Sequence, residues 1–139
     1  MGYSASQVDS ELHIAAQDEP AAVAAVKAWA CRMVQQNTGL VNCHEAETVA
    51  QAETIQDILE VWDYTPEFDQ AGDVADVHWC EPDNFGRVWH QQDLWNVLAP
   101  YVRPGSYLEM CGDATRGERW RWKFDGQTCQ EILPTLVWE

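Results

Sequence analysis

The segment at residues 106–131, SYLEMCGDATRGERWRWKFDGQTCQE, constrains the fold more than any other part of the chain. Within it, three aromatic residues alternate with three cationic ones, and Leu108 and Met110 alternate with more polar neighbours. This period-2 pattern is typical of strands that have one buried face. We therefore predict three antiparallel strands with an aromatic inner face formed by Trp120, Trp122 and Phe124. The opposite face then carries Arg119, Arg121 and Lys123.

The dipeptide Asp125-Gly126 predicts the turn between the second and third strands, because both residues tolerate the positive φ that a two-residue hairpin requires. This turn predicts the cross-strand pairs Phe124–Gln127, Trp122–Cys129 and Trp120–Glu131. Acidic side chains on the neighbouring strand, such as Glu109, are the expected partners of the three cations. Helices from elsewhere in the chain must cover the aromatic face.

The remaining hydrophobic pattern predicts a mixture of helices and strands. Helices are expected at residues 20–36, after Thr54 until Pro66, and at 88–102, with a short one after Cys43. Strands are expected at 3–15 and 74–80, with a strand end and turn at 68–73 before the second of them, and one more strand at 135–138. The order is β-α-α-β-β-α-β-β-β. We therefore predict an α+β fold with a ferredoxin-like antiparallel sheet, additional strands, and helices packed on one face. A chain of 139 residues is expected to form a single domain, 1–139.

The negative charge is concentrated in the first two-thirds of the chain. The net charge is -15, and residues 33–86 contain twelve acidic residues and neither Lys nor Arg. From Arg87 onwards the chain is nearly neutral. Such a surface repels nucleic acid and anionic membranes, so we expect no direct contact with either.

The remaining composition indicates a cytoplasmic protein. The longest purely apolar run, at residues 21–26, is far shorter than the ~20 residues that span a bilayer. The first residues show no signal-peptide pattern. Five cysteines with no CxxC spacing favour reduced thiols over a disulfide framework.

We interpret the acidic region as a candidate partner-binding surface. After Thr54, acidic residues lie on the side of the predicted helix that is opposite Ile55, Ile58 and Leu59. Acidic residues in a cluster can approximate the charge density of DNA, which carries about one charge per 3.4 Å on each strand. The alternative interpretation is a solvated acidic surface that maintains solubility. The candidate partner-binding residues are Glu45, Glu47, Glu53, Asp57, Glu60, Asp63, Glu67, Asp69, Asp73 and Asp76.

Catalytic motifs are weak in this sequence. His78, Cys80 and His90 lie near one another in the sequence, but they lack the spacing of a zinc site with a second ligand pair. The segment at 69–73 lacks the later ligands of a calcium loop. We therefore expect no catalytic residues, no metal and no cofactor. A small metal- or thiol-dependent enzyme that uses His78, Cys80 or His90 remains the alternative, as does a housekeeping interaction module.

Both ends of the chain, MGYSASQVDSELHIAA and GSYLEMCGD with RWRWKFDGQTCQE, resemble a family of small uncharacterised proteins of bacteriophages and bacterial genomes. The resemblance implies a phage or mobile-element origin. Small acidic phage proteins often inhibit host defence, and anti-CRISPR proteins are among them. We therefore predict a non-enzymatic, anti-CRISPR-like inhibitor in the cytoplasm of a bacterial host. Its acidic, DNA-mimicking surface would bind a nucleic-acid-handling defence protein.

Overall fold

The structure is a computed structural model that describes residues 6–36, 43–79, 91–111 and 119–134. Four α-helices and six β-strands are described in these ranges. The helices are α1 (Glu19–Gln35), α2 (Cys43–Ala50), α3 (Ile55–Val61) and α4 (Gln91–Leu98). The strands are β1 (Ser6–Glu11), β2 (Tyr64–Phe68), β3 (Val74–Trp79), β4 (Tyr107–Cys111), β5 (Arg119–Phe124) and β6 (Cys129–Ile132).

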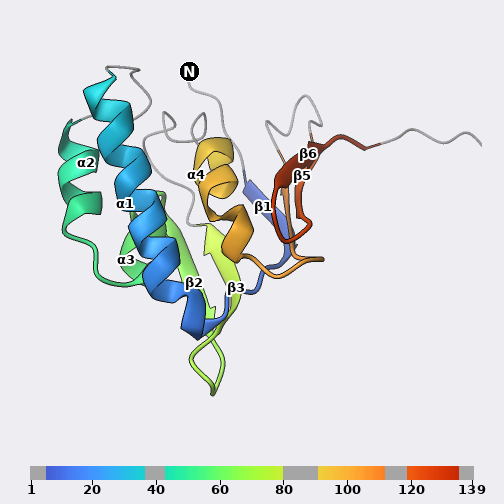
Figure 1. The fold of residues 1–139 in the computed structure, drawn as a ribbon. Helices are drawn as coiled ribbons and strands as arrows, with labels where there is room; N and C mark the ends of the chain where they lie inside the picture. Colours follow the sequence, from blue (N-terminus) through green and yellow to red (C-terminus); the bar gives the residue numbers. More distant parts are fainter. Residues whose placement is uncertain (1–5, 37–42, 80–90, 112–118, 135–139) are drawn as a thin grey trace, which may run out of the picture.

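Two antiparallel sheets share one hydrophobic core. The larger sheet has the strand order β1-β4-β5-β6, and β2 pairs only with β3. Figure 1 shows α4 between the larger sheet and the layer formed by α1, α2 and α3, with the turn of the β2–β3 hairpin extending below them. Buried residues from all these helices and from both sheets form a single cluster, so α4 packs on both sides.

The mixed α+β class and the antiparallel sheet are confirmed, whereas the ferredoxin-like arrangement is not confirmed. The hairpin β2–β3 forms a separate two-stranded sheet. It meets the chain after β1 at one bridge, where Ile14 and Val74 exchange N–H···O hydrogen bonds of 3.1 and 2.8 Å. The predicted strand at 135–138 lies outside the described residues.

The three strands at residues 106–131 form as predicted, but the turn differs. Phe124 pairs with Cys129 and Trp122 with Glu131, which is two residues from the predicted register. The reason is the carboxylate of Asp125, which accepts hydrogen bonds from the N–H groups of Gln127 and Thr128. These contacts stabilise a four-residue turn. Because a two-residue shift preserves the period of a strand, the inward and outward faces remain as predicted.

Gly126 in this turn is required by both backbone conformation and space. Its φ is +96°, a region that side chains disfavour. A Cβ atom added there would lie 2.8 Å from Cγ of Pro104.

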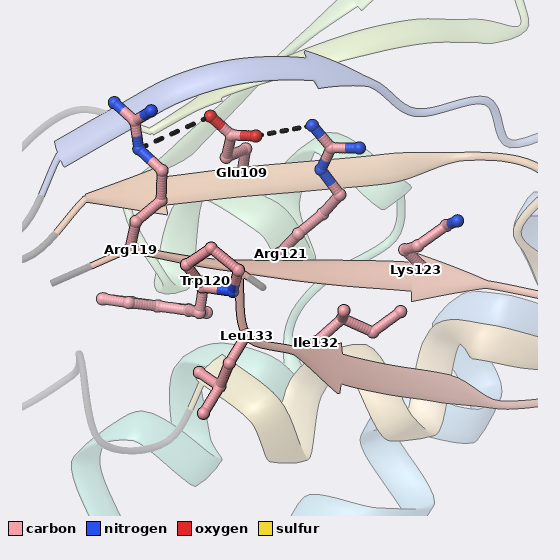
Figure 2. Close-up of a pocket in the computed structure, with 8 residues that line it drawn as sticks. Glu109, Arg119, Trp120, Arg121, Lys123, Ile132 and Leu133 are labelled. Atoms are coloured by element: carbon pink, nitrogen blue, oxygen red, sulfur yellow. Dashed lines mark hydrogen bonds and ion pairs between the residues drawn. The ribbon is translucent and has the colours of Figure 1, made fainter. Parts of the chain in front are cut away.

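Two of the three cations on β5 pair with Glu109, as predicted. Figure 2 shows the Glu109 carboxylate between two guanidinium groups, 2.6 Å from Nη2 of Arg121 and 3.7 Å from Nε of Arg119. The Arg121 guanidinium also lies 4.7 Å from the ring centre of Tyr107. The hydrogen bond to Glu109 raises the pKa of Arg121 above its ordinary value. Lys123 has no acidic partner among the described residues.

The side chains of the aromatic face differ in how far they are buried. Trp122 and Phe124 are 3% exposed, whereas Trp120 is half-buried and packs edge-on against Trp122. The ring of Trp95 from α4 meets Phe124 at 5.8 Å between ring centres. The prediction that helices cover this face is confirmed at α4.

Helix α3 begins as predicted at a capping box. The N–H of Asp57 donates to Oγ1 of Thr54, and the Asp57 carboxylate accepts from the N–H of Thr54. The inner face of Ile55, Ile58 and Leu59 is buried.

The predicted end of this helix at Pro66 is wrong. Asp63 adopts a φ of +67°, and a residue in this left-handed conformation commonly ends a helix. The helix therefore ends at Val61. Pro66 lies within β2, where a missing N–H is tolerated because each strand of a two-stranded sheet has a free edge.

The capping box should make stability depend on pH. Hydrogen bonds from the N–H groups of Glu53 and Thr54 hold the pKa of Asp57 below its ordinary value of 3.8. The folded state therefore favours the carboxylate. This stabilisation is complete above the ordinary pKa and is lost as the pH falls through the lower folded pKa. In urea titrations we expect Asp57→Asn to reduce the loss of stability between about pH 5 and pH 2. Glu60→Gln on the same helix is the control, and equal slopes for parent and Asp57→Asn would contradict the expectation.

No helix in the described part of the chain is long and apolar enough to cross a bilayer.

Candidate functional site

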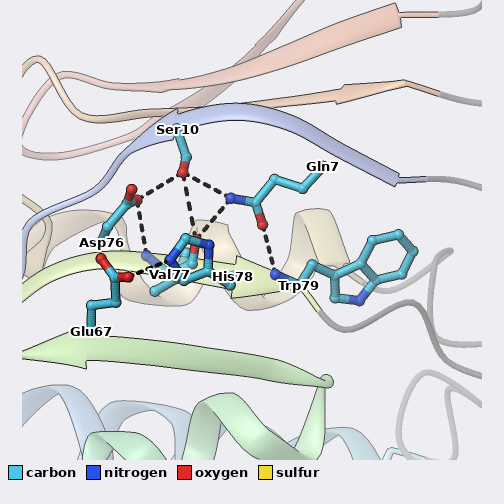
Figure 3. Close-up of polar contacts among 7 residues, drawn as sticks. All are labelled: Gln7, Ser10, Glu67, Asp76, Val77, His78 and Trp79. Atoms are coloured by element: carbon cyan, nitrogen blue, oxygen red, sulfur yellow. Dashed lines mark hydrogen bonds and ion pairs between the residues drawn. The ribbon is translucent and has the colours of Figure 1, made fainter.

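A groove lies between β1 and β3, where the two sheets approach each other. Residues 7–10 of β1 line one side, and Asp76, His78 and Trp79 of β3 line the other. Side-chain hydrogen bonds cross this groove from β1 to β3 (Figure 3).

Gln7 joins the two strands with its side chain. Its Nε2 donates to the carbonyl oxygen of Val77 at 2.8 Å and to Oγ of Ser10 at 2.8 Å. Its Oε1 accepts the N–H of Trp79 at 2.7 Å. One carboxamide thus satisfies a donor and an acceptor on β3 that a neighbouring strand would otherwise pair.

A bulge in β1 explains why Gln7 and Ser10 both face β3. The pairing with β4 skips Val8, so Gln7 opposes Met110 and Ser10 opposes Leu108. Met110 and Leu108 share the inner face of β4 and are fully buried. The extra residue therefore turns Gln7 and Ser10, three positions apart, to the same side of the sheet.

Replacing Gln7 with alanine should destabilise the protein by about 1–3 kcal/mol, because it removes the partner of the Trp79 N–H and leaves the Val77 carbonyl only the longer contact with Oγ of Ser10, at 3.5 Å. Equilibrium urea unfolding measures this loss. Gln92→Ala, on the partly exposed side of α4, is the control and should cost less. A Gln7→Ala variant as stable as the parent would show that water replaces the amide without cost.

Three potential metal ligands converge beside this groove. Glu67 on β2 stands directly opposite Asp76 on β3, and His78 lies two residues further along β3 on the same face. Nε2 of His78 lies 2.8 Å from Oε1 of Glu67. One ligand atom from each of Glu67, Asp76 and His78 lies within 4.8 Å of the others.

The structure places only part of the predicted alternative enzyme site. His78 lies at the groove, whereas Cys80 and His90 lie outside the described residues. The acidic neighbours of His78 are instead Glu67, across the hairpin, and Asp76, on the same strand. Residue spacing along the sequence did not reveal the contact with Glu67. The turn at 69–73 was the available signal, because it fixes which residue of β2 stands opposite Asp76.

The candidate partner-binding residues fall into two groups. One group lies on and around α2 and α3: Glu45, Glu47, Glu53, Asp57, Glu60 and Asp63. The other lies on the β2–β3 hairpin: Glu67, Asp69, Asp73 and Asp76. The side chain of Glu45 lies outside the described residues.

Two members of the hairpin group, Asp69 and Asp73, have local structural roles. Asp69 accepts hydrogen bonds from the N–H groups of Ala71 and Asp73 within the turn. Oδ1 of Asp73 accepts the N–H of Ala16 at 2.7 Å. These two carboxylates fix the hairpin turn and its contact with the segment before α1.

The helical group presents charge to solvent. Glu47, Glu53, Asp57 and Glu60 are exposed, and none of them pairs with a Lys or Arg among the described residues. Glu60 accepts a hydrogen bond from Gln56, and Asp57 forms part of the capping box. We call Glu47, Glu53, Asp57 and Glu60 the helical acidic surface.

Thiol chemistry has little support among the described cysteines. Cys31, Cys111 and Cys129 form no disulfide with another described residue, and Cys31 is exposed. Burial raises the pKa of Cys129 to about 12, so this thiol is protonated near neutral pH.

Comparison with protein-family models, with curated proteins and with solved structures found no match.

Proposed function

We propose that this protein is a non-enzymatic inhibitor that binds a nucleic-acid-handling protein of a bacterial host through the helical acidic surface. The observation that carries the proposal is the absence of compensating cations. Residues 33–86 contain no Lys or Arg, and the exposed carboxylates of α2 and α3 pair with none from elsewhere in the described chain. An uncompensated field of one sign attracts a basic surface.

The spacing of these carboxylates suits a groove that holds phosphates. At ~1.5 Å of rise per residue, Asp57 and Glu60 are about 4.5 Å apart along the axis of α3. Glu53 lies just before the N-cap of this helix, at the same end as Asp57. Each DNA strand presents one charge per ~3.4 Å. A neighbouring helix contributes Glu47, and α2 packs against α3. The two helices together approach the charge density of one strand.

The resemblance of the chain ends to small bacteriophage proteins supports a target in a defence complex, of the anti-CRISPR-like kind. The same charge that attracts a basic protein repels nucleic acid, so the proposed partner is a protein. The proposed site of action is the cytoplasm of the host. No reaction and no cofactor belong to this function.

Capture from a bacterial lysate followed by elution with DNA tests the proposal. The immobilised protein should retain basic nucleic-acid-binding proteins, and added duplex DNA should release them, because both ligands compete for one site. A parallel column that carries the same protein with Glu47, Glu53 and Glu60 changed to Gln separates the acidic contact from non-specific retention. Partners that both columns retain equally and that DNA does not release would contradict the proposal.

A further inference from the structure

We propose that Glu67, Asp76 and His78 form a binding site for a divalent transition-metal ion, with Zn²⁺ as the ion that fits best. The site is independent of the proposed inhibitory function. It also departs from the expectation of no metal, which rested on residues that are close together in the sequence. One imidazole and two carboxylates are ligands that Zn²⁺ accepts in proteins.

The hairpin register brings the three side chains to one face. Glu67 opposes Asp76, and His78 follows on the same face because successive side chains of a strand alternate. The other face carries the buried residues Tyr64, Val77 and Trp79. Figure 3 shows the Glu67 carboxylate turned toward the His78 ring, with the Asp76 carboxylate beside them.

The distances are close to those of a bound metal. The three ligand atoms lie within 4.8 Å of one another. Bonds of ~2.1 Å in a tetrahedral site place two ligand atoms roughly 3.4 Å apart. The side chains of Glu67 and His78 are 60% and 54% exposed. They are therefore free to close this gap without moving the backbone.

Hydrogen bonds fix the orientation of the Asp76 carboxylate. Its Oδ1 accepts hydrogen bonds from Oγ of Ser10 at 2.8 Å and from the N–H of Val77 at 2.9 Å. Its Oδ2 has no hydrogen-bond partner among the described residues, and that oxygen is available to a cation. Metal-binding carboxylates are commonly oriented by such outer hydrogen bonds. Ser10 is in turn held by Gln7.

Electrostatics favours a cation at this position. Like charges directly opposite each other destabilise an antiparallel pair, and Glu67 opposes Asp76. A divalent ion would bind both carboxylates and take the Nε2 lone pair of neutral His78, replacing the contact with Glu67. The adjoining groove leaves a fourth position for water or a further ligand.

Isothermal titration calorimetry of the reduced protein with ZnCl₂ tests the site. The histidine ring signals in NMR spectra provide a second readout. We expect one zinc equivalent whose affinity falls at least about tenfold in His78→Ala and in Glu67→Gln, with the parent's His78 signals shifting on addition of zinc. Ser10→Ala should weaken binding by about tenfold, as loss of an outer hydrogen bond does. Circular dichroism checks that these substitutions leave the fold intact.

The chain offers a matched control. His13 lies 3.4 Å from Glu11 and forms a second His–Glu pair, which no third ligand joins among the described residues. His13→Ala should bind zinc as the parent does. The proposal is overturned if the parent binds no zinc, which would leave an ion pair only. It is also overturned if His78→Ala and Glu67→Gln bind as tightly as the parent, which would assign the metal to thiols or other groups.

Discussion

Replacing Trp95 with alanine should lower the free energy of unfolding by about 3–5 kcal/mol, the usual cost of truncating a large buried aromatic side chain. Trp95 is fully buried. Its ring packs edge-on against Tyr64 at 5.1 Å and against Phe124 at 5.8 Å between ring centres. It therefore connects the β2–β3 hairpin to the larger sheet through α4.

Equilibrium urea unfolding of Trp95→Ala measures this loss, and Trp120→Ala is the matched control. Trp120 is half-buried at the margin of the sheet, so its truncation creates a smaller cavity. We expect Trp120→Ala to cost clearly less than Trp95→Ala. Equal losses, or a loss below about 1 kcal/mol for Trp95→Ala, would show that α4 does not join the two sheets as described.

Neutralising the helical acidic surface should slow association with the partner. We expect Glu47→Gln, Glu53→Gln and Glu60→Gln together to reduce the association rate at low salt by about tenfold or more, because steering by a single-sign field contributes factors of that size. The difference from the parent should shrink at high salt, where the Debye length falls from ~10 Å at 0.1 M to ~3 Å at 1 M. Surface plasmon resonance with the captured partner measures the association rates of the variant and of the parent at low and at high salt.

Asp57 is left unchanged in this variant because its carboxylate caps α3. A control variant loses the same charge elsewhere, through Glu11→Gln, Asp93→Asn and Glu131→Gln. It should associate at a rate closer to that of the parent. If both triple variants slow association equally, the net charge of the protein attracts the partner. The carboxylates of α2 and α3 would then contribute no more than carboxylates elsewhere on the surface.

The strands at 106–131 were predictable because their pattern is local. Alternation of Trp120, Trp122 and Phe124 with cations determines both the strand and its faces. The register of the last pair was not predictable from Asp125-Gly126, because the carboxylate of Asp125 stabilises a longer turn. Side-chain hydrogen bonds of this kind compete with the two-residue turn, and the dipeptide is compatible with both.

For the helix after Thr54, too, one end was predictable from the sequence and the other was not. Its start follows from Thr54 and Asp57, which are three residues apart. Its end depends on Asp63 adopting a positive φ, and Pro66 then joins a strand whose free edge tolerates it. Propensity alone placed that proline at a helix end.

The groove between β1 and β3 lay beyond what the sequence could predict. Gln7 and Val77 are seventy residues apart, and their contact depends on a bulge at Val8 that has no clear sequence signal. Glu67 and His78 meet only once the hairpin register is known. The acidic region, by contrast, is visible in composition alone. The structure adds that the hairpin carboxylates Asp69 and Asp73 stabilise the turn, whereas those of α2 and α3 face solvent.

Displacement of labelled duplex DNA from the captured partner tests the proposed inhibition most directly. The parent protein should release the DNA at stoichiometric concentrations, and the variant with Glu47, Glu53 and Glu60 changed to Gln should require about ten times more. The control triple variant should behave like the parent. A second variant, in which Arg119, Arg121 and Lys123 are changed to Gln, tests the opposite face. If the acidic variant displaces DNA as well as the parent while this cationic variant fails, the helical acidic surface is not the interface and the proposal is wrong.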